Sequence, residues 1–221
     1  MPQETEKIEK RNVIFCEGMD EKYFLIHYLN SEEMKEYSIL SNDIQVIDFG
    51  GNEELERKLE LLKISPGFNQ IKFLLIIRDA ENDAKKAVMQ IQNSLRKNGF
   101  PVPKGPGECE SKESDITIGF LLFPTCSDIA DAGTLEDLCL SILKQADHLT
   151  MTKEVQLFLE HLHGEYQREF PHKHKTVLHT YFSITDQLVG MKIGEAAKAQ
   201  AFDWNSPNLE FLKNFLLKMA P

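Results

Sequence analysis

The sequence of 221 residues contains no apolar run close to the roughly 18 residues that a membrane-spanning helix needs. Its first ten residues, M-P-Q-E-T-E-K-I-E-K, lack the apolar core of a secretory signal peptide. The four cysteines, Cys16, Cys109, Cys126 and Cys139, include no C-x-x-C pair and are interpreted as reduced thiols. We expect a cytoplasmic protein with no part in a membrane.

Positive charge is scarce, because 25 Lys and Arg residues stand against 35 Asp and Glu residues, giving a formal net charge of -10. Proteins that coat nucleic acid non-specifically do so by neutralising phosphates with Lys and Arg, so this composition argues against that class. It does not exclude a metal-dependent nuclease, because bound cations invert the local potential of an acidic site. One basic cluster is present, interpreted either as a solvated turn or as a phosphate-facing patch: Arg168, His172, Lys173, His174 and Lys175.

Two further kinds of motif are missing. No G-x-x-x-x-G-K-[ST] loop is present, so the chain is not a self-contained ATPase of that class. The sequences H-L-H at 161–163 and H-K-H at 172–174 have no cysteine nearby, and zinc is not expected there.

The single tryptophan, Trp204, is predicted to pack between helices rather than to stack on a base.

Short apolar runs alternate with helical patterns in the first two thirds of the chain. Strands are predicted at 13–16, 44–49, 71–77 and 116–123, and helices at 21–29, after a cap at Asn52, over 84–95 and over 135–143. The segment 100–115 is rich in Pro, Gly and charge and is predicted to be a loop. This alternation predicts an α/β fold with a mainly parallel, Rossmann-like sheet over residues 12–145. Only helical patterns follow, which predicts a helical extension over 152–221.

Two of the predicted strands end in acidic residues. V-I-F-C-E-G-M-D carries Glu17 after the first strand, and F-L-L-I-I-R-D-A-E-N-D carries Asp79 after the third. The carboxyl ends of parallel strands meet at one edge of a sheet, where ligands bind in open α/β folds. Carboxylates gathered there repel one another unless a cation lies between them, and Mg²⁺ prefers oxygen ligands. The sequence therefore predicts a divalent metal site that contains Glu17 and Asp79.

Other acids near these strand ends are candidates with a local alternative. Glu81 is two positions from Asp79, so in an extended segment both side chains project to the same side and reach one ion. Asp83 either supplies another oxygen or caps the following helix. Asp20 and Glu21 begin a predicted helix, where acids are favoured by the helix dipole alone, and are secondary candidates.

Glu136 and Asp137 form the last acidic pair, at the start of the helix that Thr134 is predicted to cap. Local helix physics favours acids at these positions. Their place after the fourth strand also brings them to the same sheet edge, where they would be ligands of a second cation. Both interpretations stay open.

These residues carry a resemblance to the Toprim domain, which is shared by primases, topoisomerases and the overcoming-lysogenization-defect nucleases. Glu17, Gly18, Asp79 and Glu81 match its motif, although the family usually has Asp where Glu81 stands. The sequence G-T-L-E-D-L at 133–138 is similar to a later acidic element of the nuclease branch. The likeness covers roughly residues 12–145, and the tail is similar to the ends of small stand-alone Toprim-like proteins.

The resemblance implies cleavage of nucleic-acid phosphodiesters with Mg²⁺ or Mn²⁺, in phage defence or repair, with DNA favoured over RNA. Two ions about 4 Å apart would activate water and stabilise the leaving oxygen. Lys175 or Lys173 would stabilise charge on the phosphate, and with a single ion Glu17 would act as general acid or base. The expected catalytic residues are Glu17, Asp79 and Lys175.

Two alternatives keep a similar fold. In the first, the chain is a non-catalytic module that binds nucleic acid or protein and acts with a separate ATPase, since the larger nucleases it resembles carry an ATPase domain. In the second, Asp79 accepts a phosphoryl group in a regulatory domain, although no suitable Lys follows a fifth strand. An oligomer is compatible with each of these functions.

Overall fold

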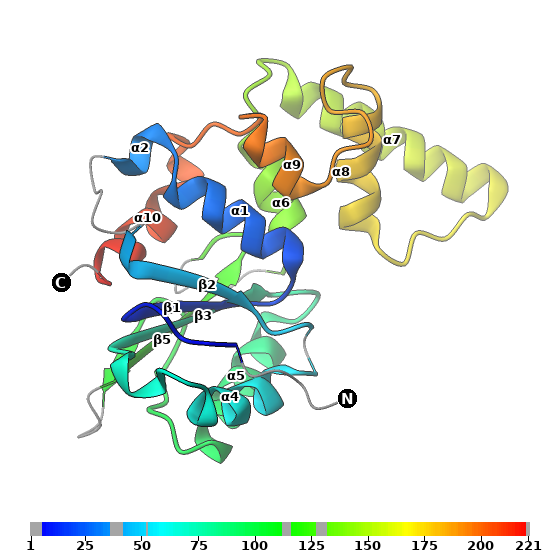
Figure 1. Ribbon diagram of the computed structural model, residues 1–221. Coiled ribbons are helices and arrows are strands. Elements are labelled where there is room, and N and C mark those ends of the chain that lie inside the picture. The colour runs from blue at the N-terminus through cyan, green and yellow to red at the C-terminus, as the bar shows by residue number, and fades with distance from the viewer. Residues whose placement is uncertain (1–5, 36–41, 52, 112–115, 127–131, 220–221) are drawn as a thin grey trace.

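The computed structural model describes residues 6–35, 42–51, 53–111, 116–126 and 132–219, so Asn52 and its predicted cap lie outside it. Five strands form one sheet in the order β2-β1-β3-β5-β4 (Figure 1). Their bounds are β1 Asn12–Cys16, β2 Ile44–Asp48, β3 Phe73–Asp79, β4 Cys109–Ser111 and β5 Thr117–Phe123. The first four in space are parallel and β4 is antiparallel, which confirms the predicted mainly parallel α/β sheet.

The central strands form where the sequence has unbroken apolar runs. Every residue of β1 and β3 is buried, as expected for parallel strands that are covered on both faces. Cys16 of β1 pairs with Ile77 of β3, and Asp79 of β3 pairs with Phe123 of β5. Strand β3 thus runs two residues further than predicted, and Asp79 is its last residue rather than the first residue of a loop.

The helices are placed close to their predicted positions. They are α1 Met19–Leu29, α2 Glu32–Lys35, α4 Leu55–Ile64, α5 Ala84–Lys97, α6 Leu135–Ser141, α7 His148–Tyr166, α8 Lys173–Ser183, α9 Ile193–Lys198 and α10 Glu210–Leu217, with short 3-10 turns η1 Phe68–Gln70 and η2 Pro207–Leu209. Helix α6 ends two residues earlier than predicted, and Leu143 forms an isolated bridge with Phe202. None of the helices in the described residues is long and apolar enough to cross a membrane.

One local prediction was wrong. The segment 100–115 is not wholly a loop, because Cys109–Ser111 forms β4 on the edge of the sheet. Residues 112–115 lie outside the described part. The strand has no apolar periodicity, and its backbone pairs with β5 because tertiary context brings the two together.

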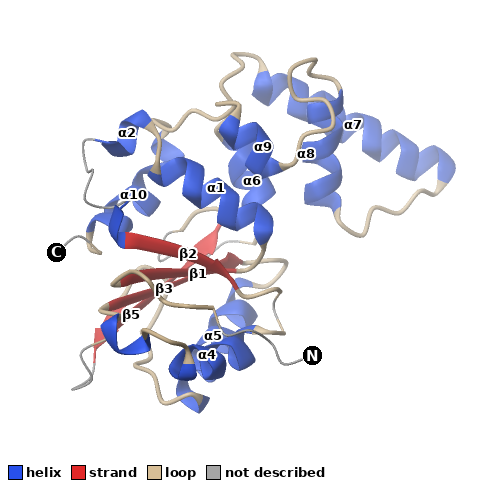
Figure 2. Cartoon of the chain, in the orientation of Figure 1, coloured by secondary structure: helices blue, strands red, loops and turns tan. Residues whose placement is uncertain are grey.

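Two cores cover the two faces of the sheet (Figure 2). Helices α4 and α5 pack on one face through residues such as Leu59 and Ile91. Helices α1, α6, α9 and α10 pack on the other. Helices α7 and α8 pack on α6 and on each other, and extend beyond the sheet (Figure 1).

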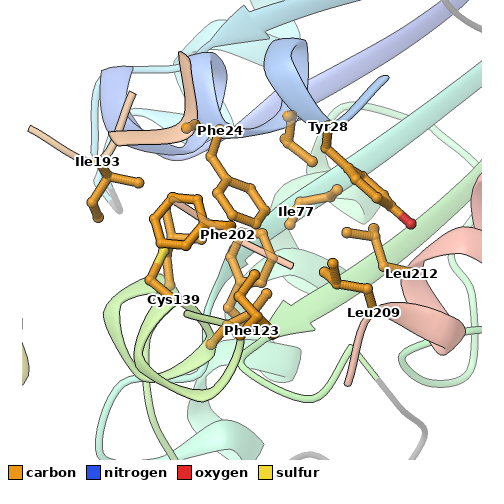
Figure 3. Packing of buried hydrophobic residues seen from close by; sticks show 14 of the residues in the cluster. Phe24, Tyr28, Ile77, Phe123, Cys139, Ile193, Phe202, Leu209 and Leu212 are labelled. Carbon is orange, nitrogen blue, oxygen red and sulfur yellow. The ribbon is translucent and has the colours of Figure 1, made fainter. Parts of the chain in front are cut away.

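The C-terminal helices complete the second core. Phe24 of α1 lies 5.7 Å from the ring of Phe202 and 5.3 Å from that of Trp204, between ring centroids, as the packing in Figure 3 shows for the phenylalanines. Gly119 of β5 leaves room for Phe215 of α10, whose ring would lie 2.6 Å from a Cβ at that position. Trp204 therefore packs between helices as predicted, and the helical extension shares a core with the sheet. The division at residues 145 and 152 stays a prediction.

Candidate functional site

A cavity of about 380 Å³ opens at the carboxyl edge of the sheet. One side of it is acidic and is lined by Glu17, Glu21, Asp79, Glu81 and Glu136. The other side is basic and is lined by His172, Lys173, His174 and Lys175. The strand ends, the first turn of α6 and the first turn of α8 thus bring together residues that are far apart in sequence.

Asp79 is one of two acids of the cavity that are almost fully buried, with 7% of its surface exposed, and Glu136 is the other. Its Oδ1 accepts a hydrogen bond of 2.9 Å from the backbone N–H of Leu135, the first residue of α6. Burial, followed by repulsion from Glu21, Glu17 and Glu136, raises the pKa of Asp79 to about 9. In the absence of a cation, this carboxyl therefore holds a proton at neutral pH.

Glu17 follows β1 and has a side chain that is 15% exposed. Its Oε2 lies 3.4 Å from the backbone nitrogen of Asp79, which donates to it. Burial raises the pKa of Glu17, and the guanidinium of Arg78 opposes that rise. The two acids predicted to converge are thus joined through one backbone hydrogen bond.

Arg78 was not among the predicted residues. It is 2% exposed, its Nε lies 3.9 Å from Oε2 of Glu17, and its Nη1 donates to Gln90 of α5. As the one basic residue of β3 it had a visible signal, because a buried charge in a strand needs a partner. Its positive charge offsets part of the charge of Glu17.

Glu21 is part of the site, although the sequence pattern indicated it only as a secondary candidate. It lines the cavity from the first turn of α1, and burial raises its pKa to about 7, with repulsion from Glu17 and Glu136 adding to the rise. Its position in the first turn of the helix that follows β1 was the available signal, because a helix that begins at the carboxyl edge of the sheet presents its first turn to that edge.

Glu81 and Asp83 lie differently from the extended arrangement that was expected. Glu81 has a φ of 56°, and its backbone exchanges two hydrogen bonds with Gly133, so residues 79–81 are not an extended segment. The exposed Glu81 side chain still lines the cavity. Asp83 caps α5 by accepting from the backbone N–H of Lys86 at 3.0 Å and does not line the cavity.

Glu136 and Asp137 separate in the structure. The Glu136 side chain is 4% exposed, lines the cavity and lies 3.7 Å from Nζ of Lys175. Asp137 closes the capping box of α6, where its Oδ2 accepts from the backbone N–H of Thr134 at 2.8 Å. It also contacts His174 and is not a lining residue. The predicted cap at Thr134 is therefore confirmed.

The basic side comes from the first turn of α8. Burial alone would lower the pKa of Lys175, but Glu136, Glu21 and other nearby acids outweigh it and raise the pKa. Arg168, the remaining member of the predicted basic cluster, does not line this cavity. The other four members line it, and two of them, His174 and Lys175, contact acids of α6.

The chemistry of the acidic side fits a hard divalent cation. Its donors are carboxylate oxygens, and the pKa values of Asp79, Glu21 and Glu17 are raised by burial first and by neighbouring acids second, both of which a bound cation would offset. The carboxylates are spread around the cavity and do not converge on one point. Within the described residues, no three His, Cys, Asp or Glu side chains are close enough together to hold one ion in this conformation.

Comparisons with known proteins found one matching family and two similar solved structures. A family described as "Protein of unknown function (DUF3226)" matches residues 11–220, and no curated protein matches significantly. The C-terminal region of the OLD protein of Xanthomonas campestris pv. campestris is 15% identical, with 96% of both chains covered and a TM-score of 0.45. That of Burkholderia pseudomallei is 12% identical, with 97% of this chain and 100% of that chain covered and a TM-score of 0.46.

Proposed function

The chain belongs to the DUF3226 family of proteins of unknown function, and we propose that its cavity is a divalent-metal-dependent site for cleaving nucleic-acid phosphodiesters. The observation that carries this proposal is the division of one cavity into a carboxylate side and a basic side. Carboxylates suit a hard cation, and lysines suit the phosphate that such a cation would also contact.

Glu17, Glu21, Asp79 and Glu136 are the residues that would hold Mg²⁺ or Mn²⁺, with Glu81 at the exposed margin. When bound, the ion would supply Lewis-acid polarisation of the phosphoryl group and activation of water. Asp83 and Asp137 are left out of this set, because neither lines the cavity and each caps a helix.

The chain's own residues have separable roles in this proposal. Asp79 is held in place by the N–H of Leu135, which donates to one of its two oxygens. The buried guanidinium of Arg78 lies 3.9 Å from the carboxylate of Glu17 and helps to hold it in place. Lys175, with a side chain that is 60% exposed, balances Glu136 and reaches into the cavity, where it would contact a phosphoryl oxygen.

The assay that tests the proposal compares single-stranded, duplex and nicked DNA with RNA, each in Mg²⁺, Mn²⁺ or EDTA. We expect cleavage that requires the ion and is lost in Glu17→Gln, because the amide keeps the shape but supplies a weaker ligand. Glu60→Gln, an exposed position on α4, is the matched control and should cleave normally. Cleavage in EDTA, or equal cleavage by Glu17→Gln, would contradict the proposal.

A second candidate is a metal-binding module that performs no chemistry and acts on nucleic acid or protein with a separate ATPase. The net charge of -10 favours it, because an acidic protein is poorly suited to hold a nucleic-acid substrate on its own. It predicts Mn²⁺ binding that Glu17→Gln weakens, with no cleavage of any of the four substrates. The same assay, combined with calorimetry of Mn²⁺ binding, separates the two functions.

A further inference from the structure

His174 lines the cavity and is held in place by Asp137. Its Nδ1 lies 2.8 Å from both carboxylate oxygens of Asp137. An ionised carboxylate can only accept hydrogen bonds, so Nδ1 is the nitrogen that donates to it. That leaves Nε2 as the ring nitrogen available to a ligand.

Asp137 is itself rigidly placed. Its Oδ2 accepts from the backbone N–H of Thr134 at 2.8 Å and from the Thr134 hydroxyl at 3.3 Å. Gly133 has a φ of 134°, and a Cβ there would lie 2.9 Å from both Oδ2 of Asp137 and Cδ of Pro124. A glycine at this position therefore makes the room that the carboxylate occupies. The same turn pairs with Glu81 across the cavity edge.

Local helix stability does not explain the basic residues of α8. Lys173, His174 and Lys175 occupy its first turn, which contains no acidic residue. Cations at this end of a helix are unfavourable, because the N-terminal end of the helix dipole is positive. Instead, His174 and Lys175 contact Asp137 and Glu136, so two consecutive residues of α8 are fixed on two consecutive residues of α6. The contacts place the imidazole opposite the acidic side of the cavity.

We propose that His174 donates a hydrogen bond from Nε2 to a phosphodiester oxygen of the substrate, and that Asp137 is the residue that positions it. This inference rests on the proposed function for the identity of the ligand. In this role Nδ1–H is donated to Asp137 and Nε2–H to the phosphate. The His174 side chain is 39% exposed, so it is accessible to a ligand while one side remains fixed.

The test uses the full chain and a 5′-phosphorylated thymidine dinucleotide as probe, in Ca²⁺ so that binding is measured without cleavage. Binding is followed by calorimetry and by the ring ¹⁵N signals of histidine. We expect His174→Ala to raise the Kd about tenfold, in line with the loss of one hydrogen bond to a charged group. Asp137→Asn should give a smaller rise, and free imidazole should restore binding to His174→Ala.

His163→Ala is the matched control. Its Nδ1 also faces a carboxylate, that of Glu169 at 3.7 Å, but the residue does not line the cavity, so its Kd should equal that of the wild type. An unchanged Kd in His174→Ala, or wild-type Nε2 signals that do not move when the probe is added, would overturn the inference.

The outcomes separate this inference from the proposed function. If the wild type cleaves DNA, and His174→Ala binds the probe and cleaves DNA as well as the wild type does, only the role of His174 is overturned. A protein that binds the probe through His174 but cleaves no substrate supports the contact and overturns the nuclease. Absence of both binding and cleavage overturns both.

Discussion

Replacing Asp79 by Asn should remove a pH-dependent loss of stability from the metal-free protein. With its pKa raised to about 9, folded Asp79 keeps its proton where an unfolded aspartate, with a pKa of about 3.9, has lost it. Between these values the folded state binds more protons than the unfolded state, so the free energy of unfolding falls as the pH rises. Stability associated with this group is thus fully present below about pH 4 and is lost by about pH 9.

The size of the effect follows from the same pKa. Each pH unit in this window costs about 1.4 kcal/mol, so from pH 5 to pH 8 Asp79 lowers the free energy of unfolding by up to about 4 kcal/mol. This is a large part of the roughly 5–15 kcal/mol that stabilises a typical domain. Asn avoids the loss, because it does not ionise and its carbonyl can still accept the N–H of Leu135.

Urea unfolding in EDTA at several pH values between 5 and 8 measures this difference, with fluorescence of the single, buried Trp204 as the probe. We expect the wild type to lose stability relative to Asp79→Asn as the pH rises. Mn²⁺ should reverse the order at pH 8, because an ion that binds the folded wild type stabilises it. Asp186→Asn, at an exposed turn, is the control and should follow the wild type. A difference between wild type and Asp79→Asn that stays constant from pH 5 to 8 would refute the reasoning.

Two further predictions concern one residue beside the cavity, Gly133, and one that lines it, Lys175. Gly133→Ala should lower the free energy of unfolding by more than about 1 kcal/mol in urea unfolding, because its φ of 134° and the contact with Asp137 leave no room for a Cβ. Gly164→Ala, in open space within α7, should instead raise it by about 0.5–1 kcal/mol, and equal effects would contradict this account. Lys175→Met should lower kcat for DNA cleavage about 100-fold through loss of a charge at the phosphate, whereas Lys175→Arg keeps the charge and should lose much less. An unchanged kcat in Lys175→Met would remove Lys175 from the site.

The sequence was most informative where a physical cause is local. The strand β3 is a continuous apolar run, and α5 has a clear apolar stripe with Asp83 at its cap, so both were predicted close to their observed bounds. The edge strand β4 was missed because C-E-S has no periodicity and pairs only when β5 is beside it. Local patterns therefore identified the interior of the sheet but not its edge.

The candidate site was predictable in part for the same reason. Glu17 and Asp79 follow apolar strands, so parallel pairing alone places them at one edge. Glu21 was ranked low because a helix start explains an acid without any ligand. Neither the pairing of His174 with Asp137 nor that of Arg78 with Glu17 has a local signature, because each depends on how distant elements pack.

The central claim is that the acids of this cavity bind one or more divalent cations. A crystal grown with Mn²⁺ tests it through the anomalous difference map recorded near the manganese edge. The account predicts a peak within about 2.5 Å of carboxylate oxygens that include those of Asp79 and Glu17. A map with no peak in the cavity, in crystals where Asp79 and Glu17 are well ordered, would contradict it.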